Sequence, residues 1–194
     1  MIVLVISIIL LITYLIPRYN TPIVIPDFIS PSERNYIIKQ ASSNLVSSKV
    51  GTNQLYMDKS RISETAFLDT NDTVVKGVIQ RCASLTDRPL KNCEKLQVTH
   101  YKPGGYYKPH QDVIDLNNYR LYTIILALNE DYEGGETVFP NLGKEYKLKA
   151  GEALFFHTLD NYELMTSKAL HGGKPVKSGE KWICNLWVHK YPYL

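Results

Sequence analysis

The sequence predicts an α+β protein, mainly β, in which a jelly roll (a double-stranded β-helix) is buttressed by helices near the N-terminus. Three observations support this fold class. Two segments before residue 85 have helical features, the segments after residue 94 are short and rich in β-branched or aromatic residues, and turn-forming glycines and prolines separate them. Several short strands after two helices are typical of a β-sandwich or jelly roll.

The first 17 residues are apolar, and no charged side chain occurs before Arg18. This run is slightly shorter than the roughly 20 residues that span a bilayer comfortably. It has no basic start and no clear small-residue cleavage site, which favours an uncleaved signal-anchor over a cleaved signal peptide or a buried element. We therefore predict a signal-anchor or transmembrane segment at 1–17 and one domain at 18–194.

Two helices are expected in the first half of that domain. A short strand comes first, and then Ser30 can cap a helix in which Pro31 suits the first position and Glu33 completes a capping box. The second helix is predicted over 71–84, because its apolar residues recur with helical spacing: Val74, Val75, Val78, Ile79 and Cys82.

Strands are expected after residue 94, between turns that contain Gly-Gly or Pro-Asn. Their expected ranges are 94–101, 119–128, 136–139, 146–149, 152–156 and 181–189. In the last strand, alternation places one set of side chains on a common face. That set is Lys181, Ile183, Asn185, Trp187 and His189.

Charge and cysteine content restrict the function classes. A net charge of +3 without a Lys/Arg cluster gives no reason to expect nucleic-acid binding. Cys82 and Cys93 could form a disulfide if the chain enters an oxidising lumen, whereas Cys184, in an apolar strand, is expected to be a buried thiol.

One pair of residues suggests metal chemistry. His110 and Asp112 would point to the same face of a strand, so both could reach one ion. An imidazole and a carboxylate are two-thirds of the facial triad that binds Fe(II) and leaves positions open. His171, at a strand end before a glycine pair, is a candidate third ligand. The pair alone is also compatible with ordinary surface residues.

The order of several blocks makes the chain similar to the prolyl 4-hydroxylases, a family of Fe(II)- and 2-oxoglutarate-dependent dioxygenases with a jelly-roll fold. The resemblance covers roughly residues 22–192, so 18–194 would be the catalytic domain. The blocks that carry it are SRISETAFL (60–68), LQVTHYKPGGYYKPHQD (96–112), YRLYTIILALNEDYEGGETVFP (119–140), GEALFF (151–156) and HGGKPVKSGEKWICNLWVH (171–189).

The resemblance implies a catalytic group of four residues. His110, Asp112 and His171 would bind iron, and Lys181 would pair with the distal carboxylate of 2-oxoglutarate. A buried ammonium needs an anionic partner, which a dicarboxylic acid supplies.

Further residues are assigned to the cosubstrate. Tyr101 and Thr137 match positions that hydrogen-bond the same carboxylate. Thr123 could line the pocket, because it faces away from Tyr122, and Trp187 could share the cavity with the lysine on its strand.

The resemblance also implies a peptide site. Tyr107, Arg120 and His189 match family positions that contact the peptide, and tyrosine faces suit the proline rings of extended segments. His100 and His157 are expected to be structural. The interval between Asp112 and Arg120 is shorter than in many relatives, which leaves the breadth of substrates open.

The implied reaction hydroxylates a peptidyl proline at C4 with Fe(II), 2-oxoglutarate and O₂, and releases succinate and CO₂. Ascorbate would restore oxidised iron. The expected partner is a proline-rich or collagen-like protein, with no nucleic acid. The compact form is that of plants, algae, large viruses and some bacteria. The leader suggests a secretory-pathway membrane such as the endoplasmic reticulum, with a lumenal domain, and a virus-encoded protein in an infected cell is compatible.

Three alternatives remain open from the residues. Another 2-oxoglutarate-dependent peptidyl hydroxylase, such as a lysyl hydroxylase, would usually have arginine where this chain has Lys181. A non-catalytic jelly-roll binding module would have lost the iron. A zinc hydrolase could use the same two histidines and carboxylate, but no separate general base is apparent near them.

Overall fold

The computed structural model describes residues 15–49, 59–113 and 115–193. Its helices are α2 (Pro31–Ser42) and α3 (Thr73–Ala83), and short 3₁₀ turns occupy Leu90–Asn92, Pro140–Leu142 and Ser167–Ala169. The strands are β1 (Ile23–Ile25), β2 (Val46–Ser47), β3 (Arg61–Ile62), β4 (Glu64–Phe67), β5 (Gln97–Tyr101), β6 (Tyr106–His110), β7 (Arg120–Ala127), β8 (Tyr132–Gly134), β9 (Thr137–Phe139), β10 (Lys144–Tyr146), β11 (Ala153–His157), β12 (His171–Gly173), β13 (Val176–Gly179) and β14 (Lys181–His189).

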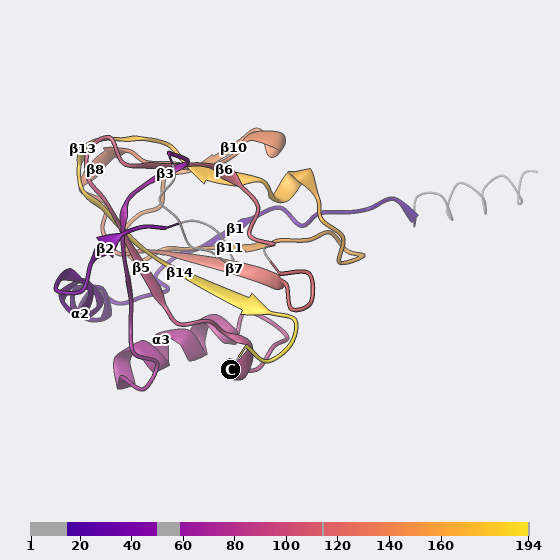
Figure 1. The fold of residues 1–194 in the computed structure, drawn as a ribbon, viewed down its shortest axis with the longest axis horizontal. Coiled ribbons are helices and arrows are strands. Elements are labelled where there is room, and N and C mark those ends of the chain that lie inside the picture. Colours follow the sequence, from indigo (N-terminus) through magenta and orange to yellow (C-terminus); the bar gives the residue numbers. More distant parts are fainter. Residues whose placement is uncertain (1–14, 50–58, 114, 194) are drawn as a thin grey trace, which may run out of the picture.

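The strands form two main sheets that face each other, and the helices cover the outer side of the larger one (Figure 1). The large sheet has seven strands in the order β1-β11-β7-β14-β5-β4-β2, and the small sheet has five in the order β10-β9-β12-β6-β3. A third, two-stranded sheet pairs β13 with β8. This arrangement is the mainly β jelly roll that the sequence predicts.

The first helix begins where the sequence predicts, and the second, predicted from residue 71, begins at Thr73. Ser30 accepts a hydrogen bond from the backbone N–H of Glu33, and the Glu33 carboxylate accepts one from the Ser30 N–H, which completes the capping box. The second helix is capped by Asp72, whose side chain accepts from the N–H of Val75. Because Pro31 occupies the first turn, where no N–H is needed, it does not interrupt α2.

The alternation of side chains along β7 separates two cores. Ile124 and Leu126 point outward and pack with the helices in a core that includes Val78 of α3. Ile125 and Ala127 point inward and belong to a second core between the sheets. The large sheet is therefore buried on both faces. Its inner face, which faces the small sheet, can carry the side chains of a site beside the second core.

Several expected elements differ in detail. The expected strand at 146–149 lies earlier, at Lys144–Tyr146, and Leu148 is buried outside it. The short strands β2, β3, β8, β12 and β13 were not foreseen, because two to four residues carry too little periodicity to be recognised.

The disulfide between Cys82 and Cys93, which the sequence leaves open, is not formed in the structure. Cys82, Cys93 and Cys184 are all buried and carry free thiols. Burial raises the pKa of Cys93 to about 11 and raises that of Cys82 further, so both thiols stay protonated and unreactive.

Most of the predicted anchor segment lies outside the described residues, which begin at Leu15. Within the part of the chain that the structure describes, no helix has both the length and the apolar character needed to cross a membrane.

Candidate metal and cosubstrate site

The structure brings together His110, Asp112 and His171 in the space between the two sheets. Their ligand atoms all lie within 4.8 Å of one another. The Asp112 carboxylate is 3.6 Å from Nε2 of His110 and 3.5 Å from Nε2 of His171. Both distances exceed those of ordinary hydrogen bonds, so the three groups do not satisfy one another directly.

Strand pairing explains how the two histidines meet across 61 positions of sequence. His110 ends β6, His171 begins β12, and the two are direct partners in the antiparallel register. Asp112 lies in a bend beyond the end of β6, so the simple alternation argument does not hold for it. The chain turns at this point, and the turn, not the pleat, directs the carboxylate toward the imidazoles.

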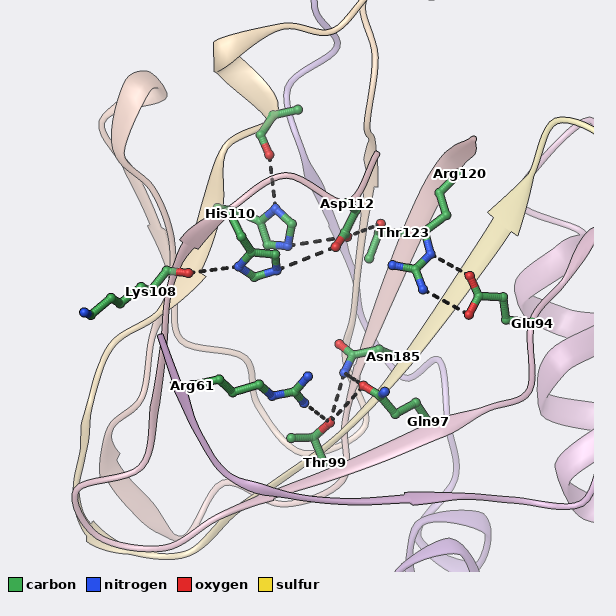
Figure 2. A network of polar contacts seen from close by, with 12 residues as sticks. Arg61, Glu94, Gln97, Thr99, Lys108, His110, Asp112, Arg120, Thr123 and Asn185 are labelled. Atoms are coloured by element: carbon green, nitrogen blue, oxygen red, sulfur yellow. Dashed lines mark hydrogen bonds and ion pairs between the residues drawn. The ribbon is translucent and has the colours of Figure 1, made fainter. Parts of the chain in front are cut away.

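Each imidazole is oriented by a backbone carbonyl. Nδ1 of His110 donates to the carbonyl of Lys108 at 2.9 Å, and Nδ1 of His171 donates to the carbonyl of Ala169 at 3.1 Å. A proton held on Nδ1 leaves the Nε2 lone pair free, and both Nε2 atoms face the carboxylate (Figure 2 shows the His110 and Asp112 contacts). This pattern of a ligand histidine held by its other nitrogen is typical of metal sites.

The charges of the group suit a metal ion. Burial lowers the pKa of His171 to about 4, an effect larger than the opposing influence of Asp112. Burial would by itself raise the pKa of the Asp112 carboxyl, but the two imidazoles and Arg120 together hold that pKa well below its usual range. At neutral pH the site therefore presents a neutral His171 and an ionised carboxylate, which are the ligating forms.

A pocket of about 420 Å³, part of it open to solvent, connects this group with Lys181. Lys181 is 5 % exposed, and its ammonium donates to the carbonyl of Gly135 at 2.6 Å. Burial, together with the nearby Lys147, lowers the pKa of Lys181 to about 8, so most of the side chain is still charged at pH 7. Among the described residues this carbonyl is the one hydrogen-bond partner of the ammonium, and a buried cation bonded to a neutral group favours an anionic ligand.

Tyr101 and Thr137, which the resemblance assigns to the cosubstrate, line the same pocket as Lys181, and Trp187 lies on the pocket face that alternation predicts for it. Tyr101 pairs with Lys181 across β5 and β14, and the ammonium lies 5.4 Å from the centre of its ring. Thr137, Asn185 and Trp187 also line the pocket. The indole Nε1 of Trp187 is buried and has no hydrogen-bond partner within the described part of the chain. An unpaired buried donor at a pocket wall is a sign of a missing ligand.

Gly172 allows the two histidine-bearing strands to approach closely. A Cβ at this position would lie 2.8 Å from the carbonyl oxygen of Tyr107 and 2.9 Å from the nitrogen of Pro109, both backbone atoms of the neighbouring strand. At Gly173 the nearest such atom is 3.9 Å away. The first glycine of the pair is therefore the one that sets the spacing between β12 and β6.

Thr123 does not line the pocket, contrary to the expectation that it contacts the cosubstrate. Its hydroxyl instead donates to Oδ2 of Asp112 at 2.7 Å (Figure 2). The side chain of Thr123 does point toward the site, as expected. The Asp112 carboxylate, which lines the pocket, takes up its hydroxyl.

Two of the three expected peptide contacts are also placed differently. Arg120 makes a two-pronged ion pair with Glu94, and its guanidinium lies 3.8 Å from the ring centre of Trp187. His189 is buried and contacts Glu94 through Nε2 and the carbonyl of Asn118 through Nδ1. Beside His189 the pairing with β7 shifts in register, because β7 contributes one extra residue, Leu121, and the imidazole of His189 is engaged by Glu94.

The third expected peptide contact, Tyr107, lies at the pocket. Its ring stacks on His110 with centroids 3.6 Å apart, and the guanidinium of Arg61 lies 4.8 Å from its centre on the neighbouring strand β3. The other expected roles are consistent with structural positions: His100 is buried between Glu64 and Glu180, and His157 contacts Asn20.

Two charged residues of the site were not assigned a role from the sequence. Arg61 is 8 % exposed, lines the pocket and donates to the hydroxyls of Ser63 and Thr99. Glu94 is 6 % exposed and neutralises Arg120. The sequence offered one signal for a special role of Glu94, its position just before the apolar strand β5. Its partner, Arg120, comes from the distant strand β7, so the ion pair cannot be predicted from sequence spacing.

Comparison with known proteins agrees with this geometry. The family model of the 2OG-Fe(II) oxygenase superfamily matches residues 96–189. A protein of Acanthamoeba polyphaga mimivirus named "Putative prolyl 4-hydroxylase" is 35% identical over 89% of this chain and 75% of its own length. "Probable prolyl 4-hydroxylase 7" of Arabidopsis thaliana is 32% identical over 84% of this chain and 60% of its own length.

Among solved structures, the viral collagen prolyl hydroxylase of Paramecium Bursaria Chlorella virus-1, solved as a 2OG complex, superposes with a TM-score of 0.71. It is 31% identical, and the match covers 89% of this chain and 97% of the viral chain. Fold and site thus define an Fe(II)- and 2-oxoglutarate-dependent dioxygenase. Within that class, the chain belongs to the prolyl 4-hydroxylase family.

Proposed function

We propose that this protein hydroxylates peptidyl proline at C4, with Fe(II), 2-oxoglutarate and O₂ as the other reactants and succinate and CO₂ as products. The observation that carries the proposal is the convergence of His110, Asp112 and His171 at one end of a pocket that has Lys181 at the other. Two imidazole nitrogens and a carboxylate form the donor set that suits ferrous iron, and in both histidines Nδ1 is engaged by a carbonyl, which leaves Nε2 to bind the metal.

The chain's own residues would divide the work as follows. Lys181, Tyr101 and Thr137 would hold the distal carboxylate of 2-oxoglutarate, since all three line the same pocket. Bound iron would supply the oxygen-activating chemistry that no side chain can provide. The apolar wall made by Ile125 and Ile183 would limit the access of water to the reacting groups.

The peptide would enter beside Tyr107, which is partly exposed and lines the pocket, because aromatic side chains suit contact with proline rings. The partnerless indole N–H of Trp187 offers a hydrogen bond to a ligand in the same pocket. Arg120 and His189 would support Trp187 and would not contact the peptide themselves. Glu94 engages both side chains, and Arg120 stacks on the indole. A proline-rich or collagen-like segment is the substrate class that agrees with the relatives' names.

The test is direct. The full chain in detergent, with Fe(II), 2-oxoglutarate and ascorbate, is incubated with proline-rich, collagen-like and lysine-containing peptides. We expect a mass gain of one oxygen atom on proline and matching release of succinate. Oxygen on lysine would favour a lysyl hydroxylase, and 2-oxoglutarate-independent cleavage of a zinc-loaded sample would favour a hydrolase. The absence of Fe(II) and 2-oxoglutarate binding would leave a non-catalytic module.

Replacing Lys181 with alanine should mainly weaken the use of 2-oxoglutarate. Removing one partner of a buried charge pair costs about 2–5 kcal/mol, so we expect the KM for 2-oxoglutarate to rise on the order of 30-fold or more. Iron affinity should stay close to wild type, because Lys181 does not contact the three ligands. The measurement is succinate release against 2-oxoglutarate concentration, and an unchanged KM would contradict the assigned role.

Gly135→Ala should produce a weaker effect of the same kind. Gly135 has φ +67°, and a Cβ there would lie 3.2 Å from Cδ of Lys181, so the new methyl group would push against the lysine. Gly143 is the matched control: its φ is +61°, but no neighbour lies within 4 Å of an added Cβ. Both variants carry the same kind of backbone strain. A higher KM for 2-oxoglutarate is expected in Gly135→Ala alone, and equal values would contradict the steric argument.

The apolar segment 1–17 and ascorbate complete the proposal. The uncharged composition of the segment supports anchoring to a secretory-pathway membrane such as the endoplasmic reticulum, with the domain lumenal. Two viral proteins among the similar ones agree with a virus-encoded origin. Alkaline carbonate extraction and protease protection of expressed full chain test the anchor, and release into the soluble fraction would overturn it. Because ascorbate would restore oxidised iron, we expect hydroxylation to continue for a shorter time when ascorbate is omitted.

A further inference from the structure

We infer that Thr123 is a positioning residue, which fixes the orientation of the Asp112 carboxylate and thereby the distance between the metal ligands and the lysine end of the pocket. The inference rests on the proposed function, because it concerns the same site. The observation behind it is the 2.7 Å hydrogen bond from the Thr123 hydroxyl to Oδ2 of Asp112.

Asp112 needs a support that its own segment does not supply. His110 and His171 are each fixed within a strand and by a carbonyl bond at Nδ1. Asp112 instead occupies a bend beyond β6. A carboxylate on such a turn can rotate about its side-chain bonds unless another group holds one oxygen. The hydroxyl of Thr123 holds Oδ2 and leaves Oδ1 directed toward Nε2 of His110.

The surroundings make this bond strong. Thr123 is 1 % exposed on the interior strand β7, between Phe156 of β11 and Trp187 of β14. Asp112 is 4 % exposed, and a carboxylate binds a metal ion in its ionised form. A hydrogen bond to an ionised acceptor in a dry environment is about twice as strong as one between neutral groups. An ionised carboxylate can only accept, so the hydroxyl proton is committed to it.

The bond also connects the two halves of the site. The histidines belong to the small sheet through β6 and β12, whereas Thr123 and Lys181 belong to the large sheet through the adjacent strands β7 and β14. Anchoring Asp112 to β7 therefore links the ligand group to the sheet that carries the ammonium. A 2-oxoglutarate molecule has to reach the metal and the lysine at the same time, so the distance between them matters, and a misplacement of about 1 Å can cost about 10²-fold in rate.

The test compares Thr123→Val with Thr123→Ser in the full chain. Valine keeps the shape of threonine but removes the hydroxyl, and serine keeps the hydroxyl. We expect valine to raise the dissociation constant for Fe(II) by about 10–100-fold, the usual range for losing a residue that supports a metal ligand, and serine to restore most of the affinity. The visible spectrum of the Co(II)-loaded protein should change in the valine variant alone, because the ligand field changes when the carboxylate turns.

Thermal unfolding of the metal-free proteins separates positioning from stability. If valine lowers the melting temperature but leaves the Fe(II) dissociation constant and the Co(II) spectrum as in wild type, Thr123 is merely structural and the inference is wrong. If serine fails to restore metal affinity while folding normally, the hydroxyl is not the cause, and the inference is equally wrong. If wild-type protein itself binds neither Fe(II) nor Co(II), the proposed function fails first, and the inference fails with it.

Discussion

His110→Ala should reduce proline hydroxylation to background while the protein remains folded. Loss of a residue that merely supports a ligand costs up to about 100-fold in metal affinity, so loss of a ligand should cost at least that much. The fold should survive, because the His110 side chain is 21% exposed and contributes mainly its stack on Tyr107. The measurements are Fe(II) titration, product mass and circular dichroism.

His157→Ala is the control for this change. His157 is also partly buried on a strand of the jelly roll, but its imidazole contacts Asn20 and the ring of Tyr122, not the ligand group. It should therefore keep iron affinity and turnover near wild type. Substantial hydroxylation by folded His110→Ala would show that the reaction does not depend on this ligand set.

Gly172→Ala should have the second largest effect, although glycine contributes no chemical group. Its new methyl would lie within 3 Å of two backbone atoms of the neighbouring strand, which cannot move as a flexible side chain can. The strands β12 and β6 must therefore separate, and with them His171 and His110, which are register partners. Since a misplacement of about 1 Å can cost about 10²-fold, we expect turnover to fall by about that factor.

Gly173→Ala is the matched control, because it makes the same chemical change one residue away on the same strand. The nearest atom to its added Cβ is 3.9 Å distant, an ordinary contact, so turnover and iron affinity should remain within a few-fold of wild type. Fe(II) dissociation constants and succinate release measured for both variants decide the matter. Similar losses in the two proteins would refute the idea that strand spacing sets the ligand geometry.

The helices and the longest strands could be predicted because their signals are local. The capping box at Ser30 and Glu33 acts over three residues, and the alternation of Lys181, Ile183, Asn185 and Trp187 is fixed by the pleat of a single strand. Position 189 shows the limit of that reasoning. A shift in register depends on how two strands pair, and no pattern within β14 announces it.

The residues around the site also fall into two groups, those expected from the sequence and those whose position depends on packing. The roles of His110, Asp112 and His171 were expected from residue type and from the family resemblance, and their convergence agrees with that expectation. The position of Arg120 was not foreseen, because its guanidinium is engaged by Glu94 and the ring of Trp187, which come from other parts of the chain. Ion pairs between distant segments depend on packing, which spacing does not encode.

The sequence by itself determined the fold class, the two helices and the pocket face of the last strand, and its resemblance to a known family supplied the candidate residues for iron and a dicarboxylate. The first three follow from propensity and periodicity, which act within short segments. Only the tertiary structure decided that Thr123 serves Asp112, that Arg120 and His189 are engaged by Glu94, and that the three cysteines stay reduced. Each of these depends on the distance between side chains from separate strands or helices, and that distance is set by how the sheets and helices pack.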